Sequence, residues 1–131
     1  MKKLDDITDL REAIATHAAA LAASDSATAE KFALPGAIET HRQAAAEIAR
    51  IARPVAVETL ALAKVGFQYI SKIRFTNGGA MRRVLYRWRK EADGKWLIVS
   101  VEDTTGKRSS WSDIPELAAA VAQARAGNGN A

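Results

Sequence analysis

Pro54 marks the point where the periodicity of this sequence changes. Before it, apolar residues recur at spacings of three and four, which places them on one face of a helix. After it, β-branched and aromatic residues dominate and glycines punctuate the segments, which is typical of strands joined by turns. Helices followed by strands predict one α+β domain with a mostly antiparallel sheet.

Three helical segments are predicted ahead of Pro54. The first presents one apolar face, made of Ile7, Leu10, Ile14, His17 and Leu21. The second covers 24–34 and is interrupted by Pro35-Gly36. The third covers roughly 37–52, and its shared face carries Ile38, His41, Ala45, Ile48 and Ala52. It ends before Pro54 because the residue ahead of a proline is driven out of the helical region.

Four strands are predicted after Pro54, near 56–64, 67–76, 81–91 and 96–104. Asp93-Gly94 is the clearest hairpin turn, and Asn77-Gly78-Gly79 is another. A further helix is expected to begin near Pro115, a residue tolerated in a first helical turn. We expect a single domain over 1–125 and a short tail over 126–131.

The hairpin turns predict which side chains share a face of the sheet. A two-residue turn at Asp93-Gly94 sets Trp88 opposite Val99, Tyr86 opposite Val101 and Val84 opposite Asp103. A Gly78-Gly79 turn sets Tyr69 opposite Trp88, Ser71 opposite Tyr86 and Ile73 opposite Val84. A turn centred on Asn77-Gly78 is the alternative; it shifts these partners but keeps Tyr69 and Tyr86 on one face. The apolar face then carries Val84, Tyr86, Trp88, Leu97, Val99, Val101 and Asp103. The other face carries Arg83, Leu85, Arg87, Arg89, Trp96, Ile98 and Glu102.

Two stretches carry a family resemblance, RRVLYRWRKEADGKWLIVSVED (82–103) and ALAASDSATAEKFA (20–33). With the order of elements over 7–104, the chain resembles the nuclear-transport-factor-two-like, or cystatin-like, superfamily, which includes SnoaL-like cyclases and ketosteroid isomerases. The resemblance implies helices packed on a curved sheet in a cone-shaped α+β barrel, a conical pocket and frequent dimerisation through the outer sheet face. The chain departs from it by lacking the aspartate pair of a ketosteroid isomerase and by the extra C-terminal helix.

A pocket for a small molecule is predicted between the helices and the apolar sheet face. Its ligand-binding groups are predicted to be Tyr69, Ser71, Arg82 and Trp88, with Arg82 suited to an anionic group. Its predicted catalytic groups are Asp103 as the base, with His41 and Tyr86 orienting or polarising the substrate in a proton-transfer lyase, isomerase or cyclase.

Each of these roles has a structural alternative, so whether the chain is an enzyme stays open. A carboxylate placed like Asp103 more often caps the end of the sheet or pairs with a cation, here Arg82 or Lys107. His17 and His41 lie on apolar helical faces, where a histidine is more often a satisfied core residue. Trp88 is more often ordinary packing than a ligand contact.

The arginine-rich face suggests a partner surface, and a non-catalytic protein-interaction module that uses this face is the alternative function. Arg83, Arg87 and Arg89 surround the apolar Leu85, Trp96 and Ile98, and such a mixture favours a homodimer interface. A solvated charged strand and a nucleic-acid surface are the alternatives. Nucleic acid ranks lower because the net charge is only +4 and no recognised motif is present.

The remaining composition excludes several other classes. The chain has no cysteine, which excludes disulfides and thiolate metal sites. Its two histidines lack the i, i+4 spacing of a metal motif, and no phosphate loop or nucleophile elbow is present, so neither metal nor cofactor is predicted. No stretch approaches the ~20 apolar residues of a membrane helix. A cytoplasmic location is expected, with a secreted mature form whose leader was removed as the alternative.

Overall fold

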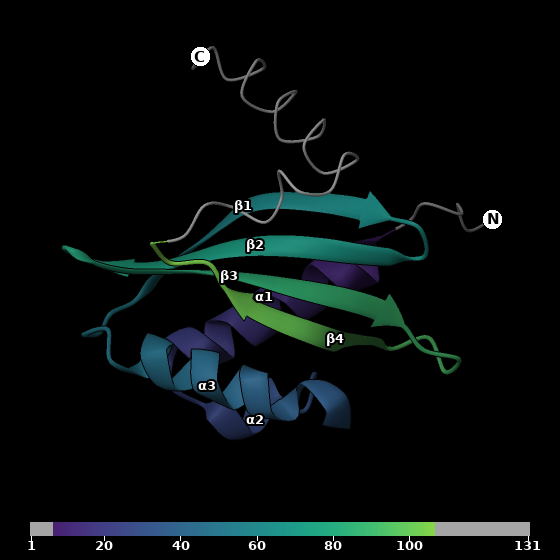
Figure 1. Ribbon diagram of the computed structural model, residues 1–131, viewed down its shortest axis with the longest axis horizontal. Helices are drawn as coiled ribbons and strands as arrows, with labels where there is room; N and C mark the ends of the chain where they lie inside the picture. Colours follow the sequence, from purple (N-terminus) through teal and green to yellow (C-terminus); the bar gives the residue numbers. More distant parts are fainter. Residues whose placement is uncertain (1–6, 107–131) are drawn as a thin grey trace, which may run out of the picture.

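The computed structural model describes residues 7–106 of the 131-residue chain (Figure 1). The helical elements are α1 (Thr8–Ala22), α2 (Ser26–Glu30), the short 3₁₀ helix η1 (Pro35–Ala37) and α3 (Ile38–Ala49). The strands are β1 (Ala56–Val65), β2 (Gln68–Asn77), β3 (Ala80–Lys90) and β4 (Trp96–Asp103). The predicted helix near Pro115 and the tail over 126–131 lie outside the described residues.

The predicted fold class is confirmed: helices pack on one face of a curved, antiparallel sheet of order β1-β2-β3-β4. Figure 1 shows α1, α2 and α3 gathered on the same side of that sheet. All four strands begin and end within one residue of the predicted positions. The change of period at Pro54 therefore correctly separates the helical layer from the sheet.

The helical layer follows from amphipathic patterning. Leu10, Ile14, His17 and Leu21 of α1 are all buried, as their spacing predicts. The second helix is shorter than predicted, and the side chain of Asp25 caps it by accepting a hydrogen bond from the backbone N–H of Thr28 at 3.2 Å. In α3, the buried residues are His41, Ala44 and Ile48.

Of the two β2–β3 registers left open by the sequence, the structure has the one set by a Gly78-Gly79 turn. Tyr69 pairs with Trp88, Ser71 with Tyr86, and Ile73 with Val84. The turn places Gly78 at φ +59°, a left-handed conformation that glycine adopts without steric cost.

The β3–β4 register departs from the prediction near its turn. The amide of Gly94 donates to the carbonyl of Glu91 at 2.9 Å, and the amide of Glu91 donates to the carbonyl of Lys95 at 2.7 Å. The loop is thus one residue longer than a two-residue turn, with Gly94 at φ +89°. A β-bulge at Val99 then absorbs the extra residue, and the predicted pairing returns from Arg87 and Ser100 onward.

These two irregularities overturn part of the face assignment. Between the turn and the bulge, Trp88 pairs with Ile98 rather than with Val99. Because side chains alternate along a strand, Trp96 and Ile98 turn toward the helices, where they are 9% and 0% exposed. The prediction that Trp96 and Ile98 lie on the arginine-rich outer face is therefore wrong: both belong to the core.

The free edge of β4 is covered by the segment between α2 and η1. The amide of Ile98 donates to the carbonyl of Phe32 at 2.7 Å, and the amide of Leu34 donates to the carbonyl of Ile98 at 2.9 Å. Ala33 forms a parallel bridge with Ile98. This segment brings the aromatic ring of Phe32 to the interior beside the sheet.

Candidate functional site

The two histidines meet in the interior between α1 and α3. Each is 1% exposed, and Nε2 of His17 lies 2.8 Å from Nε2 of His41. A neutral imidazole has one N–H and one bare nitrogen, so one ring donates and the other accepts. Sequence reasoning treated the two residues separately. Their central positions on two buried helical faces were the one signal that they would meet.

Both histidines are held neutral. Burial lowers the pKa of His17 to about 3, and the neighbouring His41 lowers it further. Burial also lowers the pKa of His41, while Glu30 raises it and Arg42 lowers it to smaller extents. A proton added to either ring would place a charge in the core, where desolvation disfavours it.

Tyr86 of β3 lies against this pair. Its ring centroid is 4.7 Å from that of His17 and 6.5 Å from that of His41. Burial, with a smaller contribution from Asp103, raises the pKa of the phenol far above its ordinary value, so it keeps its proton. In the described part of the chain, its hydroxyl and Nδ1 of His41 are both buried without a hydrogen-bond partner. An unsatisfied buried polar atom costs about 1–3 kcal/mol, which a bound water or a ligand atom would offset.

Two predicted ligand-binding residues, Ser71 and Trp88, form a hydrogen bond with each other. The indole N–H of Trp88 donates to the hydroxyl of Ser71 at 3.0 Å, and both residues are 0% exposed. Trp88 also packs edge-on against His17 and Phe32, at centroid distances of 5.7 and 6.0 Å. The indole N–H of Trp88 is therefore already paired with Ser71, and its ring packs against His17.

Tyr69 is the predicted residue that lies apart from this cluster. It is half-buried and packs edge-on against Trp96 at 5.6 Å. The aromatic contacts of the histidine pair come from Phe32, Tyr86 and Trp88.

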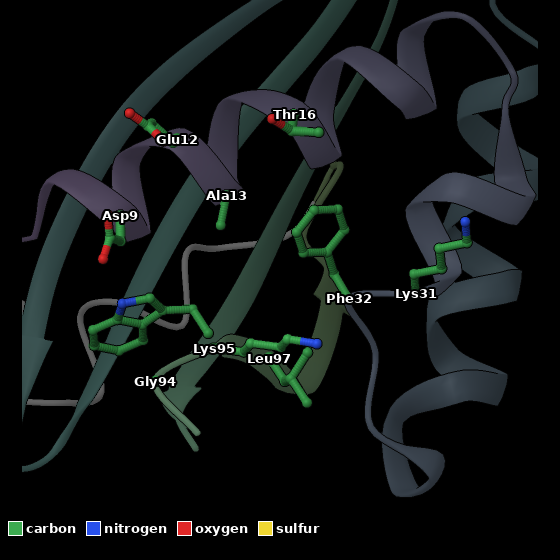
Figure 2. Close-up of a pocket in the computed structure, with 10 residues that line it drawn as sticks. Asp9, Glu12, Ala13, Thr16, Lys31, Phe32, Gly94, Lys95 and Leu97 are labelled. Carbon is green, nitrogen blue, oxygen red and sulfur yellow. The ribbon is translucent and has the colours of Figure 1, made fainter. Parts of the chain in front are cut away.

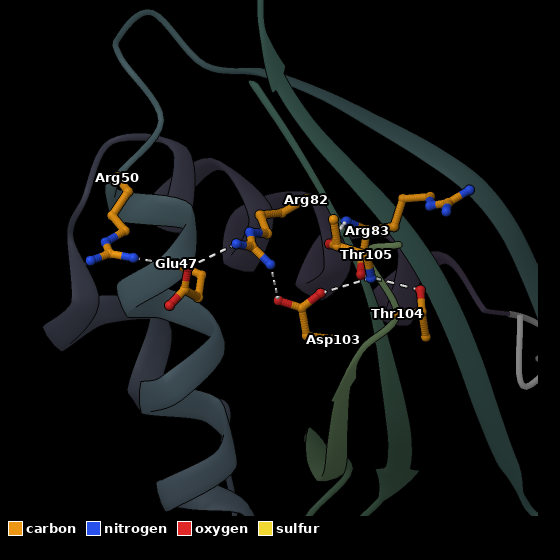
Figure 3. A network of polar contacts seen from close by, with 7 residues as sticks. All are labelled: Glu47, Arg50, Arg82, Arg83, Asp103, Thr104 and Thr105. Atoms are coloured by element: carbon orange, nitrogen blue, oxygen red, sulfur yellow. Dashed lines mark hydrogen bonds and ion pairs between the residues drawn. The ribbon is translucent and has the colours of Figure 1, made fainter. Parts of the chain in front are cut away.

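Asp103 lies at the end of β4 in a network of charged groups (Figure 3). Arg82 donates to Asp103 at 3.2 Å and to Glu47 of α3 at 2.9 Å. The other oxygen of Asp103 accepts the backbone N–H of Thr105 at 2.9 Å. The ion pair between Asp103 and Arg82, expected as the structural alternative, is thus present. The second ion pair of Arg82, with Glu47, links the sheet to α3. Glu47 was not singled out in the sequence, since nothing in its local pattern predicts its contact with a strand.

A groove of about 310 Å³ opens between α3 and β4 beside this network. It is lined by Thr40, Gln43, Ala44, Glu47, Val101, Glu102 and Asp103, and is called the α3–β4 groove below. The α3 residues follow one another at helical spacing on the side that faces β4. The groove adjoins the buried cluster, because Thr40 and Ala44 flank His41 on one helical face and Val101 pairs with Tyr86.

A second cavity, of about 420 Å³, lies on the other side of the Phe32 segment (Figure 2). It runs between α1, which contributes Asp9, Ala13 and Thr16, and the residues after the β3–β4 turn, which contribute Lys95 and Leu97. Figure 2 shows the ring of Phe32 between these two walls. The cavity carries acidic groups from the helix and lysines opposite them, with no buried polar atom left unpartnered on its lining.

The predicted interface residues divide between two places. Arg83, Leu85, Arg87 and Arg89 lie on the sheet face away from the helices, with Arg87 bonded to Gln68 and Arg89 paired with Glu91. Leu85 and its neighbour Ile70 form a small apolar cluster there, and they are only 8% and 3% exposed. Trp96 and Ile98 are in the core, as described above.

Within residues 7–106, no three histidine, aspartate or glutamate side chains are grouped as a metal site requires. The helices of the same residues include none with the length and apolar character needed to cross a membrane.

Comparison with solved structures identifies the class of fold. A nuclear-transport-factor-two-like (NTF2-like) protein of unknown function from Shewanella baltica superposes with a TM-score of 0.60 at 12% identity, over 79% of this chain and 97% of that one. A putative ketosteroid isomerase from Shewanella frigidimarina superposes with a TM-score of 0.56 at 14% identity, over 73% of this chain and 94% of that one. No protein-family model matches the sequence, and no curated protein does. The chain has the NTF2-like fold, as the resemblance of its sequence implied.

Proposed function

We propose that the protein binds a small organic molecule in the α3–β4 groove. The supporting observation is that two buried atoms beside it, the hydroxyl of Tyr86 and Nδ1 of His41, have no hydrogen-bond partner within residues 7–106. A groove of about 310 Å³ is at the lower end of the range of ligand sites, which are mostly apolar with a few convergent polar groups. A polar group of the ligand that reached either atom would offset the cost of leaving it unsatisfied.

The polar groups suit a proton-transfer reaction. Tyr86 keeps its proton and donates a hydrogen bond, which stabilises negative charge that develops on a ligand oxygen. His41 is neutral and orients the same group. Asp103 is the candidate base, as the sequence predicts, and its ion pair with Arg82 means that the ligand has to share or displace the guanidinium. Binding is the primary proposal. Catalysis is an extension of it, which the Asp103→Asn variant tests.

A binding experiment with two variants distinguishes an effect on the proposed site from an effect on the stability of the fold. Small ketones, alcohols and carboxylic acids are titrated into ¹⁵N-labelled protein, and amide shifts are followed at Ala44 and Val101. Tyr86→Phe removes only the unpartnered hydroxyl, so we expect the free energy of unfolding to be unchanged or to rise, while binding weakens. Tyr69→Phe is the matched control, since its hydroxyl lies outside the groove and its removal should leave binding unchanged. Equal weakening by the two variants would contradict the proposal.

The second candidate is partner binding through the outer sheet face, either as a homodimer or as an interaction module. It is supported by Arg83 and Arg87 beside the cluster of Ile70 and Leu85. These two apolar side chains are already covered within the chain, so the guanidinium groups would carry the interaction. Sedimentation velocity at low and high salt tests it. Self-association that Arg87→Glu and Arg89→Glu abolish supports the homodimer, and a monomer at every concentration contradicts it.

A further inference from the structure

The hydrogen bond between the histidines couples the roles of their other ring nitrogens. If His17 donates from Nε2, then Nε2 of His41 is bare and the proton of His41 is on Nδ1. If His17 accepts, His41 carries its proton on Nε2 and its Nδ1 is bare. The short separation of 2.8 Å between the two Nε2 atoms allows no third neutral arrangement, because two facing N–H groups or two facing lone pairs repel.

The atom controlled in this way, the second ring nitrogen of His41, has no hydrogen-bond partner among the described residues. Nδ1 of His41 is buried and unsatisfied, and it belongs to the helix that lines the α3–β4 groove. A ligand that donates a hydrogen bond needs the bare form of this nitrogen, and a ligand that accepts one needs its protonated form. The tautomer of His17 therefore bears on which ligand group His41 is able to bind.

We propose that His17 is a positioning residue that fixes the tautomer and ring orientation of His41, and so sets the hydrogen-bonding role of Nδ1 toward an uncharged polar group of the ligand. This inference rests on the proposed function of the α3–β4 groove. His17 itself contacts Phe32, His41, Tyr86 and Trp88, all uncharged at neutral pH, and it acts on the ligand only through His41.

The charged groups near the two histidines do not explain a preference for one tautomer of His41. Glu30 and Arg42 are the charges that act on His41, and they are joined to each other by two hydrogen bonds of 3.1 Å at the surface. Their effects on the pKa of His41 are opposite in sign. The remaining neighbours on α1 and β3 are His17 and Tyr86, and Tyr86 keeps its proton. His17 is thus the group whose tautomer has to be complementary to that of His41.

Long-range ¹H–¹⁵N correlation of the histidine rings tests the inference directly. The full-length chain has two histidines, so removal of His17 leaves a single ring spectrum to interpret. In the unaltered protein at pH 7.5, we expect complementary neutral tautomers, one ring protonated at Nε2 and the other bare there. Two rings with the same tautomer would overturn the proposal.

Two substitutions separate positioning from packing. His17→Leu fills the space without a polar atom, and we expect His41 to lose its single-tautomer pattern and show the average of both forms. His17→Gln retains an amide that can donate or accept at the same place, and we expect it to restore a single tautomer. An unchanged His41 spectrum in His17→Leu overturns the proposal. If that variant does not fold, averaging in His17→Gln overturns it.

The outcomes distinguish this inference from the proposed function. The tautomer spectra are recorded without ligand, so their failure leaves groove binding untouched. Absence of any shift at Ala44 and Val101 on titration contradicts groove binding and leaves the coupling of the histidines standing.

Discussion

Trp88 of β3 pairs with Ile98 of β4, one residue away from the partner that a two-residue turn would have given it. The offset begins in the longer turn at Gly94 and ends in the bulge at Val99. Relative to the prediction, the side chains of Trp96 to Ile98 therefore lie on opposite faces of the sheet, whereas those from Ser100 onward lie on the predicted faces. The indole of Trp96 consequently lies in the core beside Tyr69.

This register predicts very different costs for two neighbouring substitutions. Trp96→Ala removes a side chain that is 9% exposed, and we expect it to lower the free energy of unfolding by about 3–5 kcal/mol. Leu97→Ala removes a half-buried side chain and should cost markedly less, about 1 kcal/mol. Urea titrations of both variants provide the measurement. A larger loss for Leu97→Ala would contradict the bulged register.

The buried histidine pair predicts lower stability in mild acid. The pKa of His17 is 6.5 in its ordinary state and about 3 in the fold, so the unfolded chain binds more protons between these values. The stability is fully present above pH 6.5 and is lost as the pH falls toward 3, by up to about 1.4 kcal/mol per pH unit.

Urea titrations between pH 7.5 and pH 5 measure this loss. Over that range the carboxylates with lowered pKa values, Asp25 and Glu30, are ionised in both states and contribute little. His17→Gln should flatten the dependence, because it removes the group with the larger shift. An equally steep dependence in His17→Gln would show that other groups cause it.

The hydrogen bond between Trp88 and Ser71 predicts that removal of one hydroxyl lowers the free energy of unfolding. Ser71→Ala leaves the indole N–H of Trp88 buried without a partner, and such an atom costs about 1–3 kcal/mol. Ser100→Ala, at an exposed position of β4, is the matched control and should change the free energy of unfolding by less than about 0.5 kcal/mol. Equal effects from the two variants would mean that the Trp88 bond contributes nothing net.

Asp103→Asn separates a structural role of this carboxylate from a chemical one. The ion pair with Arg82 is partly exposed, so its loss should cost no more than about 1 kcal/mol, and the amide oxygen can still accept the N–H of Thr105. We expect a folded variant that has lost turnover of any substrate found for the groove. Activity that survives in a folded Asp103→Asn variant would exclude Asp103 as the base.

Local patterns predicted the elements of this fold well and the contacts between them less well. The strands and the β2–β3 register follow from alternation and a glycine turn, which involve neighbouring residues. The bulge at Val99 leaves no comparable mark, because either face of β4 offers apolar side chains. For the candidate site, Asp103 lines the α3–β4 groove, His41 and Tyr86 are buried, and Ser71 and Trp88 bond to each other, so the catalytic roles stay predictions.

By itself, the sequence determined the order of helices and strands, the faces of β2 and β3 that meet the helices, and the placement of the two histidines on apolar helical faces. Those features depend on residues close to each other in the sequence, where the spacing of apolar residues determines the type of element and the face that is buried. The tertiary structure alone decided that His17 meets His41 across 24 positions and that Arg82 joins Asp103 to Glu47. Such contacts depend on how separate elements pack, because the free energy of burial selects the arrangement of whole faces rather than any single pair.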